Sequence, residues 1–240
     1  MEVKGTITKE TISRLAKDVS HIIKNPLTEN GIYYLHDEDN MLKGYALIIG
    51  PSGTPYYRGY YLFELDFPYN YPFSPPTVKF LTNNQGIRFN PNLYTSGKVC
   101  ISILNTWHGD PWSSCQSITS VLLTLSTILN EKPLMNEPGI TEGHPEILKY
   151  NQIIAFSNIS IAICDVIQNK LYCPWLSKFR PIIEEHFIKN VDDVLNGIDN
   201  MNEADTNIIV TVQFYKLVVL MDYKMLREKV IKTKLSVMKK

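Results

Sequence analysis

Four short segments rich in aromatic and β-branched residues lie between residues 31 and 81, and they restrict the possible folds most. Their sequences are GIYYLH, LKGYALIIG, GYYLFELDF and TVKFL. The turn-forming stretches DEDN and PSGTPYYR separate the first three, and PYNYPFSPP precedes the fourth. Short strands joined by tight turns pair most simply with their neighbours in antiparallel fashion. The sequence therefore predicts a four-stranded antiparallel meander.

The stretch PYNYPFSPP is rich in proline, which cannot donate to a sheet ladder. It predicts a stiff, exposed loop that carries Tyr69, Tyr71 and Phe73. An exposed aromatic side chain on a rigid loop suits a partner contact. The alternative for the two tyrosines is that they fold back over the sheet.

Helical patterns flank the predicted strands. Ahead of them, apolar residues recur at helical spacing until Asn25 and Pro26 end the pattern. Behind them, residues 113–131 predict a helix capped by Ser113 or Ser114. After about residue 142 three more helices are expected, over residues 146–168, 174–195 and 212–235.

A break is expected in the second of these helices, and a linker is expected between the second and the third. Pro181 should kink or divide the second, and the polar stretch 196–207 should be a linker before the third. A helix, four strands and then helices, in that order, are typical of the α+β class. We therefore expect an α+β domain with a helical extension.

Composition excludes several classes of protein. The formal net charge is zero, with 24 basic and 24 acidic residues, which argues against binding nucleic acid through bulk charge. No apolar run approaches the roughly 20 residues that span a bilayer, so no membrane contact is expected. The opening MEVKGTITKE lacks the apolar core of a secretion signal. We expect a cytoplasmic protein, with the nucleus as a second location.

The four cysteines are candidates for metal ligands or nucleophiles. None is part of a CxxC pair, which argues against zinc. Cys164 and Cys173 lie among apolar residues and are expected to pack in the core. Cys115 falls in the first turn of a predicted helix, where the helix dipole would favour a thiolate, although a small packing residue is the commoner reading.

Cys100 lies in FNPNLYTSGKVCISIL, eight residues after Asn92. A thiolate can attack a carbonyl, and an asparagine amide can stabilise the oxyanion that forms or hold the loop. No histidine is adjacent in sequence, and His108 and His144 are the nearest candidates for a base. A nucleophile without an obvious base suits acyl transfer between thiols better than hydrolysis, because a thioester is already activated. Core packing of Cys100 is the alternative.

Several motifs, in order and spacing, resemble those of the ubiquitin-conjugating enzymes. GPSGTPYYRGYYLFELDFPYNYPFSPPTVKF is similar to the family's strand pair and proline loop, and FNPNLYTSGKVCISIL to its active-site block. Trp112 matches the tryptophan before the second helix, and NEPG stands at the family's acidic loop. The insertion ILNTWHGDPWSS and the continuation IAICDVIQ resemble the large subgroup that includes ubiquitin-conjugating enzyme Z and the BRUCE conjugating domain.

The resemblance implies a ubiquitin-conjugating fold, with a catalytic core over residues 1–150 and a helical extension over 151–240 packed on it. Cys100 would accept ubiquitin or a ubiquitin-like modifier as a thioester and pass it to a substrate lysine or a ligase. Asn92 would support the oxyanion or the loop, and Asn136 and Glu137 would form the gate that orients and deprotonates the lysine. No cofactor is implied, since the activating enzyme upstream uses the ATP.

The resemblance also implies partner surfaces, on a chain expected to be a monomer. Phe73, Ser113 and Ser114 would meet a ubiquitin ligase, and the basic residues Lys9, Arg14 and Lys17 would meet the ubiquitin-activating enzyme. An ordinary solvated helix face is the alternative for the basic residues.

The chain departs from the family pattern in four places. Asn90 replaces the family's histidine, Ser114 its ligase-loop proline and Cys115 an alanine. Asn136 and Glu137 replace the usual acidic gate residues, and of these two Glu137 keeps the charge.

Two other functions stay open on the residues alone. One is a binding module that presents a modifier or partners and is poorly charged itself, which the joint presence of Cys100, Asn92 and Glu137 argues against. The other is a cysteine hydrolase or redox protein, which would use Cys115, or Cys100 with His108, and would need a contact between cysteine and histidine.

Overall fold

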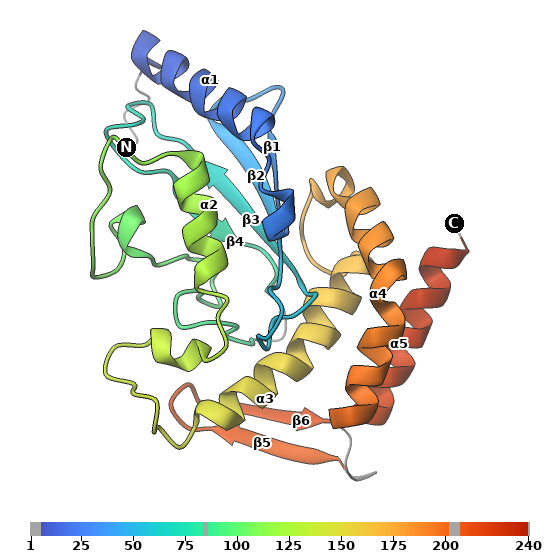
Figure 1. Ribbon diagram of the computed structural model, residues 1–240. Helices are drawn as coiled ribbons and strands as arrows, with labels where there is room; N and C mark the ends of the chain where they lie inside the picture. Colours follow the sequence, from blue (N-terminus) through green and yellow to red (C-terminus); the bar gives the residue numbers. More distant parts are fainter. Residues whose placement is uncertain (1–5, 84–85, 202–206, 240) are drawn as a thin grey trace.

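The structure is a computed structural model that describes residues 6–83, 86–201 and 207–239. A four-stranded sheet has the first helix, α1, near one end and the helix α2 in front of it in the view of Figure 1. The helix α3 runs from below the sheet towards α4 and α5, which pack side by side (Figure 1). The architecture is the expected α+β class with a C-terminal extension.

The four predicted strands are confirmed. Each is antiparallel to the next, in the sheet order β1-β2-β3-β4. The strands are β1 (Ile32–His36), β2 (Lys43–Ile49), β3 (Tyr60–Asp66) and β4 (Thr77–Phe80).

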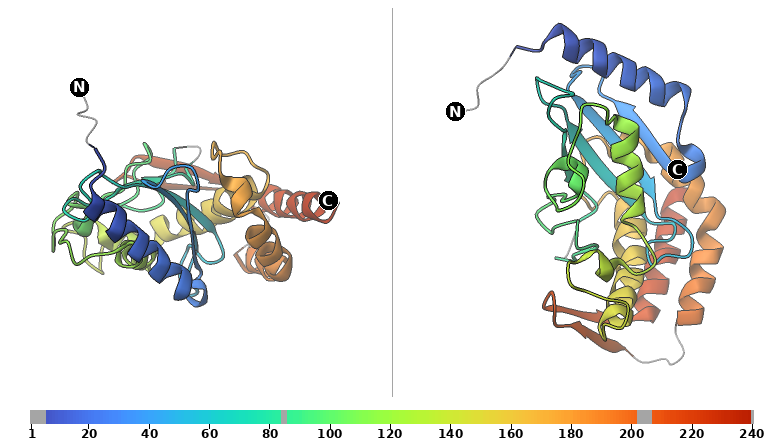
Figure 2. Two further views of the ribbon diagram at one scale, coloured as in Figure 1. Left: turned by 90° about the horizontal axis from the view of Figure 1, so that it is seen from above. Right: turned by 60° about the vertical axis from the view of Figure 1, so that its left-hand side comes forward.

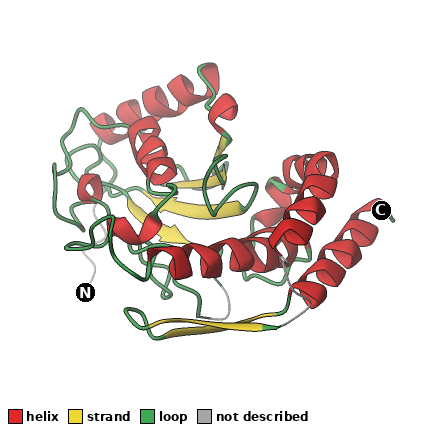
Figure 3. Ribbon diagram, turned by 60° about the horizontal axis from the view of Figure 1, so that its bottom comes forward, coloured by secondary structure: helices red, strands yellow, loops and turns green. Residues whose placement is uncertain are grey.

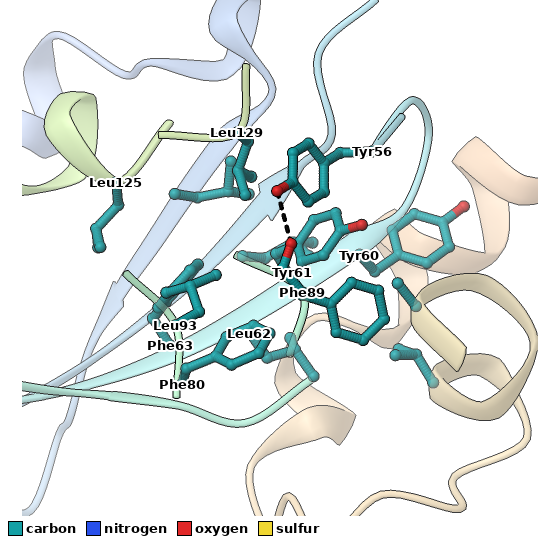
Figure 4. Close-up of a cluster of buried hydrophobic side chains, with 14 of the residues drawn as sticks. Tyr56, Tyr60, Tyr61, Leu62, Phe63, Phe80, Phe89, Leu93, Leu125 and Leu129 are labelled. Carbon is teal, nitrogen blue, oxygen red and sulfur yellow. Dashed lines mark hydrogen bonds between the residues drawn. The ribbon is translucent and has the colours of Figure 1, made fainter. Parts of the chain in front are cut away.

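Large aromatic side chains fill the core around β3. Tyr61 and Phe63 of β3 pack with Phe80 of β4 and with Phe89, and all four are fully buried or nearly so (Figure 4). The hydroxyl of Tyr56 donates to the carbonyl oxygen of Phe89 at 2.7 Å, which satisfies a polar group inside this core. This bond fixes the start of the segment that leads to Cys100.

The first helix, α1 (Lys9–Lys24), forms and ends as the sequence predicts. The Thr8 side chain caps it by accepting from the backbone N–H of Thr11 at 3.1 Å. Its inner face carries Leu15 and Ile22, both buried. Asn25, just before Pro26, forms its C-cap.

The start of α2 (Ile118–Thr127) corrects one prediction. The expected cap was Ser113 or Ser114, but Ser117 caps the helix through a capping box with Ser120. Cys115 therefore lies outside the helix, in an exposed turn, and not in its first turn. The dipole argument for a Cys115 thiolate is wrong for that reason.

The predicted helix over residues 146–168 is confirmed as α3 (Ile147–Ser157), which continues as the π-helix η4 (Asn158–Asp165). The span Ile147–Asp165 is long and apolar enough to cross a membrane by length and composition alone, with a mean hydropathy of 1.2. Within the fold 61% of its most apolar stretch is buried, so most of this stretch packs against the rest of the protein. The domain boundary expected at residue 150 falls inside α3, and the division stays a prediction.

The helix α4 (Arg180–Met201) differs from its prediction at both ends. Pro181 is the second residue of the helix. A backbone N–H in the first turn has no partner inside the helix, so the proline is tolerated there and does not divide the helix. The expected linker 196–207 is wrong up to Met201, because α4 continues through that residue with Ile198 buried. Residues 202–206 of this stretch lie outside the described residues.

The helix expected over residues 212–235 is half wrong. Residues 208–221 form an antiparallel hairpin of β5 (Ile208–Val212) and β6 (Leu217–Met221), drawn in yellow in Figure 3, and only α5 (Tyr223–Met238) is helical. Figures 1 and 2 place the hairpin beside the start of α3 and the loop before it. Val210, Val212, Leu217 and Met221 of the hairpin are buried.

Candidate active site

Cys100 lies in a segment that is folded irregularly but held along the edge of the sheet. Leu93 bridges Val99, and Phe80 of β4 donates its N–H to the carbonyl of Gly97 at 2.8 Å. Gly97 has a φ of +87°, and a Cβ there would meet the Phe80 carbonyl oxygen at 2.9 Å. Glycine is therefore required at this turn, three residues before the cysteine.

Asn92 and Cys100 are joined by reciprocal hydrogen bonds. The Cys100 N–H donates to the Asn92 carbonyl at 2.9 Å, and the Asn92 side-chain Nδ2 donates to the Cys100 carbonyl at 2.7 Å. Both residues are buried. The amide of Asn92 thus supports the loop directly, and the hydroxyl of Thr106 braces the other side of the cysteine by accepting from Ile101 N–H at 3.1 Å. Sequence analysis did not single out Thr106.

The Cys100 thiol is free but covered, since the residue is only 2% exposed. A nucleophile has to reach its substrate. Acyl transfer at this thiol therefore requires its covering neighbours to move aside.

Asn90, at the family's histidine position, is a fully buried junction of hydrogen bonds. Its Nδ2 donates to the Tyr56 hydroxyl at 2.9 Å and to the Ile128 carbonyl at 2.7 Å. Its Oδ1 accepts from Asn92 N–H at 3.0 Å and from Asn136 Nδ2 at 3.2 Å. The amide therefore ties the Asn-Pro-Asn turn to the end of α2 and to the gate segment, and so braces the loop.

Asn136 and Glu137 lie at the end of the short helix η3 (Pro133–Asn136), within reach of this network. Asn136 also donates to the Ile128 carbonyl at 3.0 Å, so its side chain is held in place. The carboxylate of Glu137 accepts a hydrogen bond from the hydroxyl of Tyr215, at the tip of the β5–β6 hairpin. Tyr215 was not among the predicted site residues, because the hairpin that carries it was expected to be a helix.

The cysteines and histidines are not paired for hydrolysis. Cys164 and Cys173 are buried as expected, and burial raises the pKa of their thiols, to about 11 and about 12. Among the described residues no hydrogen bond joins a cysteine to a histidine. The histidine side chains contact other residues, among them Asn25 for His21, Tyr34 for His36, Trp107 for His108, Glu146 for His144 and Tyr60 for His186.

The expected ligase residues lie on the surface. Phe73 is 62% exposed on the proline-rich loop, and Ser113 and Ser114 are also exposed. Tyr71 folds back into the core, where its hydroxyl donates to the Asp18 carboxylate at 2.5 Å. The indole of Trp112 donates to the Pro72 carbonyl at 2.7 Å, which holds the loop in place.

The three basic residues of α1 that are predicted to meet the activating enzyme divide into two groups. Lys9 and Lys17 are exposed. Arg14 is engaged within the protein, where its guanidinium donates to the carbonyls of Ser114, at 2.6 Å, and Gln116 and to Asp18 at 2.9 Å. These bonds link the predicted surface for the activating enzyme to the predicted surface for the ligase.

No group of three or more His, Cys, Asp or Glu side chains that could hold a metal occurs in the described part of the chain. The absence of a cofactor stays an expectation from the family.

An α+β fold with a four-stranded meander, and a cysteine and an asparagine locked together after the fourth strand, define the class of protein. The family described as "Ubiquitin-conjugating enzyme" matches residues 14–153, and the chain belongs to this family. The family is a class of transferases that act through a thioester intermediate.

Three relatives agree with the subgroup that the motifs indicate. Human "Ubiquitin-conjugating enzyme E2 Z" is 41% identical over 76% of this chain and 51% of its own length. The Caenorhabditis elegans "Probable ubiquitin-conjugating enzyme protein 17" is 37% identical over 81% of this chain and 28% of its own. Human "Dual E2 ubiquitin-conjugating enzyme/E3 ubiquitin-protein ligase BIRC6" is 37% identical over 70% of this chain and 4% of its own. This chain thus spans about half of the E2 Z protein.

Proposed function

We propose that this protein accepts ubiquitin, or a ubiquitin-like modifier, on Cys100 from an activating enzyme and transfers it to a substrate lysine or a ligase. The reciprocal hydrogen bonds between Cys100 and Asn92, inside the part of the chain that matches the family, carry the proposal. They hold the thiol and an amide donor in one rigid loop. Such fixed positioning is the main requirement for transfer of an acyl group that arrives activated.

The reaction has two acyl transfers. In the first, the Cys100 thiolate attacks the modifier's thioester carbonyl, the carbon–sulfur bond to the activating enzyme breaks, and that enzyme's cysteine leaves as a thiolate. In the second, a neutral lysine amine attacks the new thioester, an amide bond forms and Cys100 leaves as a thiolate, while the attacking nitrogen releases one proton to that thiolate or to water. Glu137 takes the proton from the incoming ammonium, which has no lone pair until it loses one.

The proposed partner surfaces are supported by the exposure of the side chains that form them. Phe73, with Ser113 and Ser114, is proposed to meet a ligase, because all three are exposed near the proline loop that Trp112 holds. Lys9 and Lys17 are proposed to contact the activating enzyme, and Arg14 to fix α1 to the ligase surface as well.

The direct test is a charging assay with activating enzyme, ATP and ubiquitin, resolved on a non-reducing gel. We expect an adduct that thiols remove, and we expect Cys100→Ser to form an ester that resists them. Cys115→Ser is the matched control, since Cys115 is an exposed cysteine outside the active-site block, and it should charge normally. An adduct located on Cys115, or none with a panel of activating enzymes and modifiers, would contradict the proposal.

The low exposure of Cys100 favours a second candidate function, a binding module on which a modifier thioester forms poorly. Cys100 is 2% exposed, so a chain that never opens would present a modifier or a partner without reacting. Normal folding with no thioester formation in the same assay would support this candidate.

We also propose that the protein is a monomer of the cytoplasm, with the nucleus as a second location. The support is that all four cysteines are free, as in reducing compartments, and that one chain fills the core around the sheet. Light scattering and imaging of a tagged protein test these two statements.

A further inference from the structure

The tip of the β5–β6 hairpin, residues 213–216, contacts the gate and the active-site block at the same time. It comes from a part of the chain remote in sequence from both. Three independent contacts hold it there.

The first contact joins the tip to the start of α3. The carboxylate of Glu146 accepts from the backbone N–H groups of Gln213, at 2.6 Å, and of Phe214, at 3.0 Å. Hydrogen bonds to an ionised acceptor are among the stronger ones in proteins. The ring of Phe214 also packs edge-on against His144.

The second contact joins the tip to the active-site block through Arg88. The guanidinium carbon lies 4.6 Å from the centre of the Tyr215 ring and 4.0 Å from that of the Tyr94 ring. The same side chain donates from Nη2 to the Pro91 carbonyl at 2.6 Å. The Tyr215 ring therefore packs against the Arg88 cation. That cation is hydrogen-bonded to Pro91, the residue between Asn90 and Asn92.

The third contact is the hydrogen bond from the Tyr215 hydroxyl to Oε2 of Glu137. Burial of Tyr215, reinforced by this bond, raises the pKa of its phenol, so the hydroxyl remains a donor at neutral and alkaline pH. A carboxylate can accept at both oxygens, so Oε1 of Glu137 is left for an incoming amine.

We propose that Tyr215 is a positioning residue for the Glu137 carboxylate during transfer of the modifier to lysine. The inference rests on the proposed function, because it requires Glu137 to act on the incoming lysine. An unrestrained glutamate side chain samples many rotamers. Glu137 can take the proton only from a rotamer that faces the amine, so holding that rotamer favours the transfer. The hairpin is then a part of the active site that the conjugating core alone does not supply.

The test is a single-turnover discharge of preformed Cys100–ubiquitin thioester to free lysine. Tyr215→Phe removes the hydroxyl but keeps the ring on Arg88. We expect it to slow discharge about fivefold, as expected for one lost hydrogen bond, with charging unchanged and the thermal midpoint lowered by only a few degrees. Tyr172→Phe is the matched control, since Tyr172 is 90% exposed, and it should discharge normally.

A double-mutant cycle with Glu137→Ala distinguishes positioning from general damage. Glu137→Ala alone should slow discharge, and adding Tyr215→Phe to it should slow discharge no further. A normal rate for Tyr215→Phe, or an equal loss in both backgrounds, would overturn the inference while leaving the conjugating function intact. Unchanged discharge in Glu137→Ala would overturn it by removing Glu137 from the gate. Failure of the wild-type protein to form any thioester would instead defeat the proposed function, and the inference with it.

Discussion

Asn90 uses both ends of its amide to join segments that are far apart in the chain. The Asn-Pro-Asn turn, the end of α2 and the gate segment all bond to it. A side chain that is both donor and acceptor can satisfy all three at once. These bonds therefore brace the Asn-Pro-Asn turn that precedes Cys100.

Asn92 should matter more in lysine transfer than in charging if it acts on the later transition state. Asn92→Ala removes the bond to the Cys100 carbonyl and leaves that buried oxygen without this partner, which should also cost roughly 1–3 kcal/mol of stability. We expect charging to be spared and discharge to be slowed. Single-turnover rates of the two steps, with a urea titration for stability, measure both effects. Equal losses in the two steps would indicate structural damage alone.

Several serines before α2 could serve as its N-cap, and the structure shows which one does. Ser113, Ser114 and Ser117 are all good N-cap residues, but only Ser117 has Ser120 three residues later and in reciprocal contact. The sequence pattern located the helix to within a few residues and misplaced its first turn. That error is what made Cys115 look electrostatically activated.

Replacement of the true cap should destabilise the protein measurably. Ser117→Ala removes the acceptor for the Ser120 N–H and should lower the free energy of unfolding by about 1 kcal/mol. Ser113→Ala, in the same exposed segment, is the control and should change it by less than about 0.5 kcal/mol. Urea-induced unfolding measures both values, and equal effects would argue against the assigned cap.

The hairpin was missed because its apolar residues fit two periodicities. Phe214, Leu217, Val218 and Met221 follow the helical spacing i, i+3, i+4, i+7, whereas burial in β6 alternates from Leu217 to Met221. A short apolar run cannot decide between the two patterns by itself. Contact with α3 decides it here, and that contact is not visible in the local sequence.

At the scale of the whole molecule, a buried charge cluster attaches α5 to the core. Asp165 of η4 is only 1% exposed and pairs with Lys229 of α5 at 2.8 Å and with Lys170 at 3.6 Å. Lys229 also donates to Ser160 at 2.9 Å. The last helix is thus joined to the helix that continues from α3 by charge as well as by packing.

Loss of Lys229 should loosen the C-terminal extension. Lys229→Met keeps the length of the side chain but removes the nearer cation from buried Asp165, and we expect a loss of roughly 3 kcal/mol. Lys232→Met, on the exposed face of α5, is the matched control and should be close to neutral. Thermal and urea unfolding measure the difference. A stability equal to that of the control would show that the pair contributes little.

The sequence predicted the meander and the family, because the motifs that carry them are encoded in continuous stretches. The roles of Asn136 and Glu137 in a gate stay predictions. Cys100, Asn92 and Glu137 could be named from motifs alone. Tyr215 and Arg88 could not, because their importance comes from contacts between segments far apart in the chain. Contacts of that kind are set by tertiary packing, which local patterns do not encode.

The bond between Glu137 and Tyr215 has a consequence for how the protein is made. The two residues are 78 positions apart, and the ribosome adds the tyrosine last. During synthesis the N-terminal part of a chain is made first. A nascent chain therefore contains Cys100 and Glu137 before it contains the tyrosine that bonds to Glu137, so this bond forms only after the hairpin has also been synthesised.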